Sequence, residues 1–137
     1  MKKVVKSLQE FKLFAEDFAK KIKKGDVVLL FGDLGAGKTT FTQFVFAALG
    51  VKEVVNSPTF AILKSYQGEF NFHHFDTYRI SVEEAIEAGF DEVVEDKESV
   101  IFIEWSENIR PLLPEKVTKV YITYIDETTR EVEIINE

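Results

Sequence analysis

Gly-Asp-Leu-Gly-Ala-Gly-Lys-Thr, residues 32–39, is the stretch that decides the fold of this chain. It matches the phosphate-binding loop pattern of glycine, four residues, glycine, lysine, and then serine or threonine. Before it, Val27–Phe31 is apolar and rich in branched side chains, which predicts a buried strand. After it, Thr39–Leu49 predicts a helix that ends at Gly50. A strand, a glycine-rich turn and a helix in this order are the frame that a phosphate loop needs.

The loop predicts a binding site for the phosphates of a nucleoside triphosphate. Glycines let backbone N–H groups curl around an anion, and the N-terminus of the following helix adds a positive dipole. The Lys38 side chain is expected to reach the β- and γ-phosphates, and the Thr39 hydroxyl to ligate Mg²⁺. We therefore expect the nucleotide to contact a run of consecutive residues: Gly35, Ala36, Gly37, Lys38, Thr39 and Thr40.

The composition favours a single domain over residues 1–137. Apolar residues make up 45% of the chain and thirteen side chains are phenylalanines, which is enough for a packed core. The net charge of −7 argues against a uniformly basic surface for nucleic acid. There is no cysteine, and therefore no disulfide, and no apolar run approaches the ~20 residues that span a membrane. We expect a soluble cytoplasmic protein with no membrane contact.

Two helices are predicted from their N-terminal caps. Ser7 and Glu10 have the spacing of a capping box, so we expect a helix over Leu8–Lys23 that ends at Gly25. A second box, which begins at Ser81, predicts a short helix that ends near Gly89, followed by an acidic surface stretch over residues 91–98.

The remaining apolar runs predict strands. An edge strand is expected near the start of the chain, a hairpin that turns at Gly68, one fully buried strand, and a closing antiparallel hairpin. Pro111 and Pro114 are expected to interrupt the chain between the buried strand and the closing hairpin. The predicted strands are Lys2–Lys6, Ala61–Gln67, Phe70–Asp76, Ser99–Glu104, Val117–Asp126 and Arg130–Ile135.

Two carboxylates stand where a phosphate-loop enzyme needs acidic groups, at the ends of predicted strands. Glu104 follows Val-Ile-Phe-Ile, and Asp76 follows Phe-His-His-Phe. Open α/β sheets bind their ligands at the carboxyl ends of strands. We expect Glu104 to take part in the Mg²⁺ shell, and Asp76 to lie near the γ-phosphate or the attacking water.

Neighbouring residues of the Asp76 strand leave several roles open. His73 and His74 are adjacent, so they point to opposite faces of a strand and cannot form a two-histidine metal site on one face. Arg79 could pair with Asp76, touch a phosphate, or form a surface ion pair. The sequence fixes no role for Tyr78 or Trp105.

Four motifs in order resemble the TsaE (YjeE) family of small bacterial ATPases. They are Gly-Asp-Leu-Gly-Ala-Gly-Lys-Thr-Thr at 32–40, Ser-Pro-Thr-Phe at 57–60, His-Phe-Asp-Thr-Tyr-Arg at 74–79, and Ile-Glu-Trp-Ser-Glu at 103–107. The resemblance spans nearly the whole chain. It departs from the family pattern at Ser106, where the family usually has proline, and this departure leaves the expected ligands unchanged.

The resemblance implies a three-layer α/β P-loop NTPase fold, with central parallel strands extended by antiparallel strands. It implies binding of ATP and Mg²⁺, slow hydrolysis by the isolated protein, and action with a TsaB–TsaD pair that modifies adenosine 37 of tRNA with threonylcarbamoyl. This chain would then meet tRNA only indirectly. The resemblance also suggests a nucleotide-sensing switch at Ser57, Pro58, Thr59 and Phe60, and nucleotide contacts from Gln9 and Arg130.

Other functions remain open on the residues alone. A nucleotide-dependent scaffold would use ATP binding to order the segment at 57–60 without any need for hydrolysis. A small-molecule kinase usually needs a lid with several arginines, whereas the arginines here are Arg79, Arg110 and Arg130, none of them in a run. A GTPase would need an Asn-Lys-x-Asp segment to read guanine, and the sequence has none.

Overall fold

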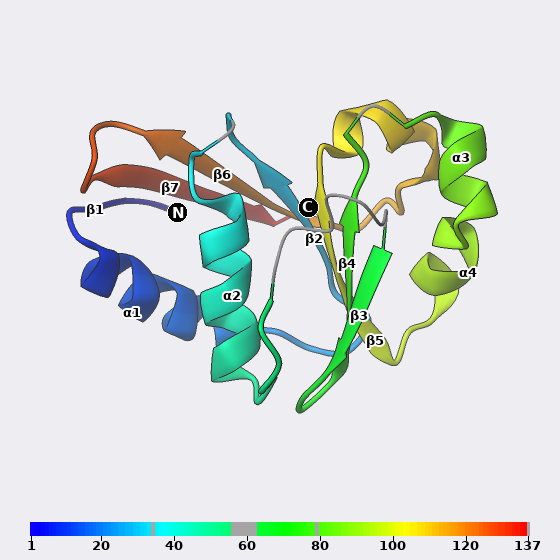
Figure 1. The fold of residues 1–137 in the computed structure, drawn as a ribbon, viewed down its shortest axis with the longest axis horizontal. Coiled ribbons are helices and arrows are strands. Elements are labelled where there is room, and N and C mark those ends of the chain that lie inside the picture. The colour runs from blue at the N-terminus through cyan, green and yellow to red at the C-terminus, as the bar shows by residue number, and fades with distance from the viewer. Residues whose placement is uncertain (34, 56–62, 79, 137) are drawn as a thin grey trace.

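A computed structural model describes residues 1–33, 35–55, 63–78 and 80–136. Its centre is a seven-stranded sheet in the order β1-β7-β6-β2-β5-β4-β3 (Figure 1). The strands are β1 Lys2–Val5, β2 Val27–Phe31, β3 Leu63–Gln67, β4 Asn71–Asp76, β5 Ser99–Glu104, β6 Thr118–Tyr124 and β7 Arg130–Asn136.

The middle of the sheet is parallel and its two ends are antiparallel. Strand β2 pairs in parallel with β5 on one side and β6 on the other, and β4 pairs in parallel with β5. The β6–β7 hairpin and β1 add antiparallel strands at one edge, and β3 adds one at the other. The expected mixture of central parallel and outer antiparallel strands is therefore confirmed.

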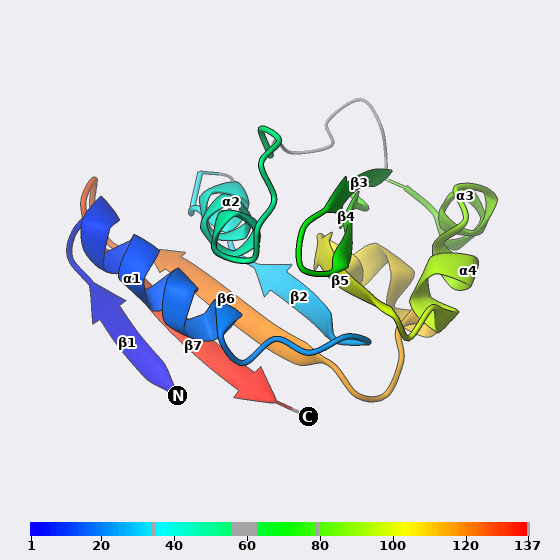
Figure 2. The same ribbon diagram turned by 90° about the horizontal axis from the view of Figure 1, so that it is seen from below.

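Helices cover both faces of this sheet. Helices α1 (Leu8–Ala19) and α2 (Lys38–Ala48) lie on one face, and α3 (Val82–Glu87), α4 (Phe90–Glu95) and the 3₁₀ helix η1 (Ser106–Leu112) lie on the other (Figure 2). Strand β2 shows why two helical layers are needed, because Val28 and Leu30 enter one core while Val27 and Leu29 enter the other. A parallel strand buried on both faces is apolar at every position.

Phenylalanine rings join the phosphate-loop helix to its neighbours. The fully buried Phe41 ring lies 6.0 Å, 6.5 Å and 5.3 Å, centroid to centroid, from Phe11, Phe14 and Phe18 of α1. One turn later, the Phe46 ring packs on the sheet, 5.0 Å from the Phe102 ring. Helix α2 is thus fixed to both α1 and the sheet by burial worth about 1.5–3 kcal/mol for each large side chain.

Helix α1 ends at Ala19, four residues before the predicted end at Lys23. Asp26 gives the physical reason, since its Oδ2 accepts the Lys23 backbone N–H at 2.8 Å. In a continuing helix that N–H would bond to the carbonyl of Ala19, which instead accepts from Ile22 in a tighter turn. Only half of the predicted capping box forms. The Ser7 hydroxyl accepts from the Glu10 N–H, but the Glu10 side chain accepts from the Lys6 N–H and not from the Ser7 N–H.

The region after β4 is more helical than predicted. The box at Ser81 forms in full, and α3 ends before Gly89 as expected. Gly89 then adopts a left-handed φ of 91°, and the acidic stretch continues as α4 because Phe90 is fully buried against Phe75. Pro111 lies inside η1 and does not end it. Along the described ranges, no helix is both long and apolar enough to cross a membrane.

Replacing Phe41 with alanine should lower the free energy of unfolding by about 3–5 kcal/mol, because the change leaves a cavity between α1 and α2. Urea unfolding followed by circular dichroism measures this loss. Leu13→Ala is the matched control on α1, since Leu13 is 52% exposed, and should change the value by less than about 0.5 kcal/mol. Equal losses in the two variants would contradict the assigned core.

Candidate nucleotide-phosphate site

The loop between β2 and α2 has a backbone that only glycine fits at two positions. Gly37 has a φ of 115°, and a Cβ placed there would lie 3.2 Å from the Phe11 ring. A Cβ at Gly32 would lie 2.6 Å from the backbone oxygen of Ile122 on β6. Helix α2 then begins at Lys38, which points the helix N-terminus into the loop. Leu34, inside the loop, lies outside the described residues.

Arg130 of β7 braces this loop from behind. Its Nε donates to the Ala36 carbonyl at 2.7 Å, and one terminal nitrogen donates to the carbonyls of Asp126 and Thr129 at 2.6 Å and 3.0 Å. The guanidinium also lies over the Tyr124 ring, 4.6 Å from its centre. Arg130, which was expected to contact nucleotide, therefore contacts the loop itself in this structure.

Lys38 is held inside the loop by a carbonyl and an aromatic ring. Its Nζ donates to the Gly32 carbonyl at 2.6 Å and lies 3.6 Å from the centre of the Trp105 ring. Burial lowers the pKa of Lys38, and the negative charges of Glu104, Asp76 and other nearby carboxylates act against that shift. A cation this poorly solvated favours an anionic ligand that can replace the carbonyl.

The structure brings Asp76 and Glu104 to one level at the ends of adjacent parallel strands. Their Cα atoms are register partners on β4 and β5, and Leu30 of β2 is the partner of Glu104 on the other side. Side chains alternate along a strand, so both carboxylates belong to the face that α2 covers. Glu104 is 3% exposed, whereas Asp76 is half-buried and its Oδ1 accepts from the Tyr78 N–H at 3.0 Å.

The proposed metal ligands Thr39 and Glu104 lie next to each other. The Thr39 hydroxyl donates to Glu104 Oε2 at 3.4 Å, a long hydrogen bond. Hydroxyl and carboxylate oxygens suit Mg²⁺, which usually takes one or two protein ligands and completes its shell with water and phosphate oxygens. Within the described residues no group of three or more acidic, histidine or cysteine side chains could hold a metal by itself. The donor set therefore fits Mg²⁺ that arrives with a nucleotide.

Trp105 is positioned by a strained turn directly after β5. Its φ of 61° is unusual for a bulky residue. The Thr77 hydroxyl stabilises this turn, lying 3.0 Å from the Glu104 carbonyl oxygen and 2.6 Å from that of Trp105, and Asn108 donates to the Thr77 carbonyl at 2.9 Å. The Tyr78 ring packs on Trp105, with the ring centres 4.9 Å apart.

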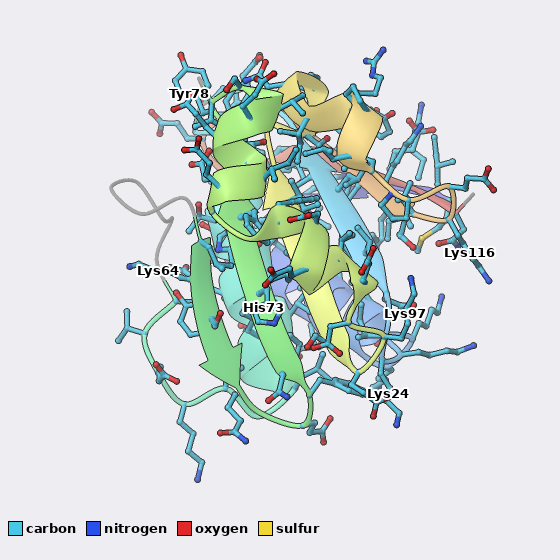
Figure 3. The ribbon with its side chains drawn as sticks, turned by 90° about the vertical axis from the view of Figure 1, so that its right-hand side faces the viewer. Lys24, Lys64, His73, Tyr78, Lys97 and Lys116 are labelled. Atoms are coloured by element: carbon cyan, nitrogen blue, oxygen red, sulfur yellow. The ribbon has the colours of Figure 1, made fainter. Side chains whose placement is uncertain are left out.

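The two adjacent histidines point to opposite faces, as predicted. His73 hydrogen-bonds to Ser65 on the face that carries α4 (Figure 3), while His74 is fully buried beneath α2. The bond between His74 Nε2 and Glu104 Oε2, at 2.7 Å, was not predicted. Strand parity could have indicated it, because His74 shares its face with Asp76 at the end of the same strand.

The other expected site residues are less constrained or cannot be placed. Thr40 is half-buried in the first turn of α2, and Gln9 is exposed in the first turn of α1. The predicted switch, Ser57, Pro58, Thr59 and Phe60, lies outside the described residues, as does Arg79. Sequence reasoning missed the supporting roles of Thr77 and Asn108, which depend on contacts between segments about thirty residues apart.

Two of the lysines lie far from this site. Tyr78, which packs on Trp105, lies at one end of the molecule, and Lys24 and Lys97 lie at the opposite end (Figure 3). Lys24 also pairs with Glu98 at 3.1 Å. Lys38 of the loop, in contrast, lies close enough to Glu104 and Asp76 for their charges to influence its pKa.

Known proteins resemble this chain over most of its length. A family model described as "Threonylcarbamoyl adenosine biosynthesis protein TsaE" matches residues 5–132. Proteins named tRNA threonylcarbamoyladenosine biosynthesis protein TsaE are similar over most of their length. The one from Rickettsia prowazekii is 42% identical over 90% of this chain and 87% of its own, and the one from Bacillus subtilis is 39% identical over 90% and 78%.

A solved structure shows the same fold. The crystal structure of YdiB from Bacillus subtilis superposes with a TM-score of 0.80, at 33% identity, over 96% of this chain and 82% of that one. The fold is that of a P-loop NTPase, a class that binds nucleotides and typically Mg²⁺. The family match spans most of the chain, and the motifs and the fold agree with it: this chain belongs to the TsaE family, whose role is in threonylcarbamoyladenosine biosynthesis for tRNA.

Proposed function

We propose that this chain binds ATP and Mg²⁺ at the loop 32–39 and hydrolyses ATP slowly. It would do so in the cytoplasm, to support threonylcarbamoyl transfer to adenosine 37 of tRNA with TsaB and TsaD. One observation carries the proposal: the Thr39 hydroxyl of the phosphate loop lies 3.4 Å from the Glu104 carboxylate on the neighbouring strand. The names of the relatives support the tRNA pathway.

Each side chain of the site has a distinct part in the proposed reaction. Lys38 binds the β- and γ-phosphates in place of the Gly32 carbonyl, and the N–H groups of the loop bind the remaining phosphate oxygens. Thr39 and Glu104 would hold Mg²⁺, directly or through water, and the ion would neutralise phosphate charge. Asp76, level with Glu104, orients the attacking water and accepts its proton.

The guanidinium at the loop supports slow hydrolysis by the isolated protein. Arg130 has its Nε and one terminal nitrogen on backbone carbonyls, so these donors are already engaged in bracing the loop. Fast phosphoryl transfer to water usually needs an arginine that stabilises the charge of the transition state. A partner protein would complete the site, which fits an ATPase that is active within a larger complex.

Lys38→Ala should weaken ATP binding about 10- to 100-fold, since a hydrogen bond to a charged group contributes about 1.5–3 kcal/mol. Isothermal titration calorimetry with ATP and Mg²⁺ measures the change. Lys24→Ala is the control, because Lys24 lies at the opposite end of the molecule, and its ATP affinity should equal that of the wild type. An unchanged ATP affinity in Lys38→Ala would contradict the proposal that Lys38 binds the phosphates.

Asp76→Asn should lower ATP hydrolysis by about 100-fold or more while ATP affinity stays within a few-fold of the wild type, because loss of a general base affects the reaction and not the ground state. The assay follows ADP and phosphate release in a reconstituted system with TsaB, TsaD, tRNA and an activated threonylcarbamoyl donor, and scores threonylcarbamoyl transfer in the same samples. Asp91→Asn, an exposed change on α4, is the control.

The same assay separates the alternative functions. If Asp76→Asn abolishes hydrolysis and repeated rounds of transfer continue at the wild-type rate, ATP binding alone suffices and the chain is a nucleotide-dependent scaffold. If the wild type forms ADP without equal release of phosphate, the phosphoryl group goes to an acceptor, as in a small-molecule kinase. Equal ADP and phosphate, with transfer lost in the variant, is the result expected for the ATPase.

A further inference from the structure

A buried histidine lies directly behind the proposed metal carboxylate and has no part in the mechanism above. The His74 side chain is fully buried, and its Nε2 lies 2.7 Å from Oε2 of Glu104, which is itself 3% exposed. This distance is at the short end for a hydrogen bond between a ring nitrogen and a carboxylate oxygen. The contact joins β4 to β5 at the edge where the phosphate loop leaves β2.

Two phenylalanines lie next to His74, and its register partner on β3 is Lys64. The His74 ring lies edge-on to the Phe46 ring of α2, with centres 6.3 Å apart, and its Cα is the register partner of Phe102 on β5. An ionised carboxylate can only accept, so the ring nitrogen that faces it carries the hydrogen. The other ring nitrogen, Nδ1, is buried and has no hydrogen-bond partner in the described part of the chain.

The unpaired Nδ1 argues against a purely structural histidine. A buried polar atom without a partner weakens folding, and a leucine of similar volume would fill this space without that cost. The polar feature that the ring contributes is the N–H bond to Glu104. The function of the residue therefore lies in what that bond does to the carboxylate.

The bond restricts the carboxylate to one orientation. Glu104 Oε2 is engaged by His74 and by the Thr39 hydroxyl together, whereas Oε1 has no partner among the described residues. A glutamate side chain has three rotatable bonds, so a second anchor deep in the core removes most of its freedom. Ligating carboxylates are commonly held by such hydrogen bonds, which orient them and set metal affinity.

We propose that His74 is a positioning residue for the nucleotide–metal site: its Nε2–H fixes the Glu104 carboxylate against the Thr39 hydroxyl, so that the free oxygen meets Mg²⁺ in one orientation. The proposal rests on the function proposed above, because it takes Glu104 as part of the metal shell. It predicts an effect on metal binding that is separate from nucleotide binding by the loop.

The test is Mn²⁺ binding to the full chain saturated with ADP, measured by electron paramagnetic resonance titration. His74→Leu should weaken Mn²⁺ binding about 10- to 100-fold, the usual effect of losing a partner of a metal ligand. Affinity for ADP without metal should stay within about twofold, because Lys38 and the loop are unchanged. His74→Gln should restore most of the Mn²⁺ affinity, since its amide can donate to Glu104 as Nε2 does.

His73→Gln is the matched control, because this neighbouring histidine faces the opposite side of the sheet and bonds to Ser65. Its Mn²⁺ affinity should equal that of the wild type. Wild-type affinity in a folded His74→Leu would overturn the positioning role and leave the proposed function intact. A wild-type protein that binds ADP but no Mn²⁺ would instead overturn the metal site itself.

A second measurement decides the matter if His74→Leu does not fold. In ¹⁵N-histidine-labelled wild type, the Nε2–H resonance of His74 should shift when Mg²⁺ is added to the ADP complex, and the His73 resonances should not. The shift is expected because Mg²⁺ would bind the same carboxylate that accepts the hydrogen bond from Nε2–H. An unmoved His74 resonance, at a Mg²⁺ concentration that saturates the site, would overturn the proposal.

Discussion

The parallel pairing of β2 with β5 is the constraint on which the site depends. The ladder sets Leu30 beside Glu104, and the chain needs only two more residues to reach Gly32, where the phosphate loop begins. The carboxylate at the end of β5 therefore lies close to the loop and helix that follow β2, because the backbone pairing of the two strands already places them together. A slip of this register by one residue would turn Glu104 toward the opposite face.

Charge balance at this edge explains the other contacts. Lys38 lies deep enough for burial to disfavour its charge, and three different groups compensate: the Gly32 carbonyl, the face of the Trp105 ring, and the negative charge of Glu104. The strained backbone of Trp105 makes sense in this setting, because an ordinary extended continuation of β5 would carry the ring away from the lysine. Thr77 and its partner Asn108 then stabilise a turn that Trp105 alone would not favour.

Local patterns in the sequence were sufficient for most of the fold. The buried strand at 99–104, the helix after the loop and the closing hairpin follow from apolar runs, glycines and caps that act within a few residues. The end of α1 did not follow, because it is decided by the Asp26 carboxylate competing for a backbone N–H. Which of these two local hydrogen bonds forms depends on the direction that the chain takes next, in this case beside Ser99 of β5.

For the site, the loop and both carboxylates could be located from motif and strand ends, since these signals lie in short stretches of sequence. The bond between His74 and Glu104 and the brace from Arg130 could not, because each joins residues that only the tertiary fold brings together. The contact from Arg130 also determines when the loop can be stabilised during synthesis of the chain. Its donor follows its acceptor by 94 positions, so a growing chain carries the complete loop sequence long before it carries the residue that fixes the loop. A ribosome-bound fragment that ends before β7 therefore holds the motif without the contact from Arg130 that supports the loop in the folded protein.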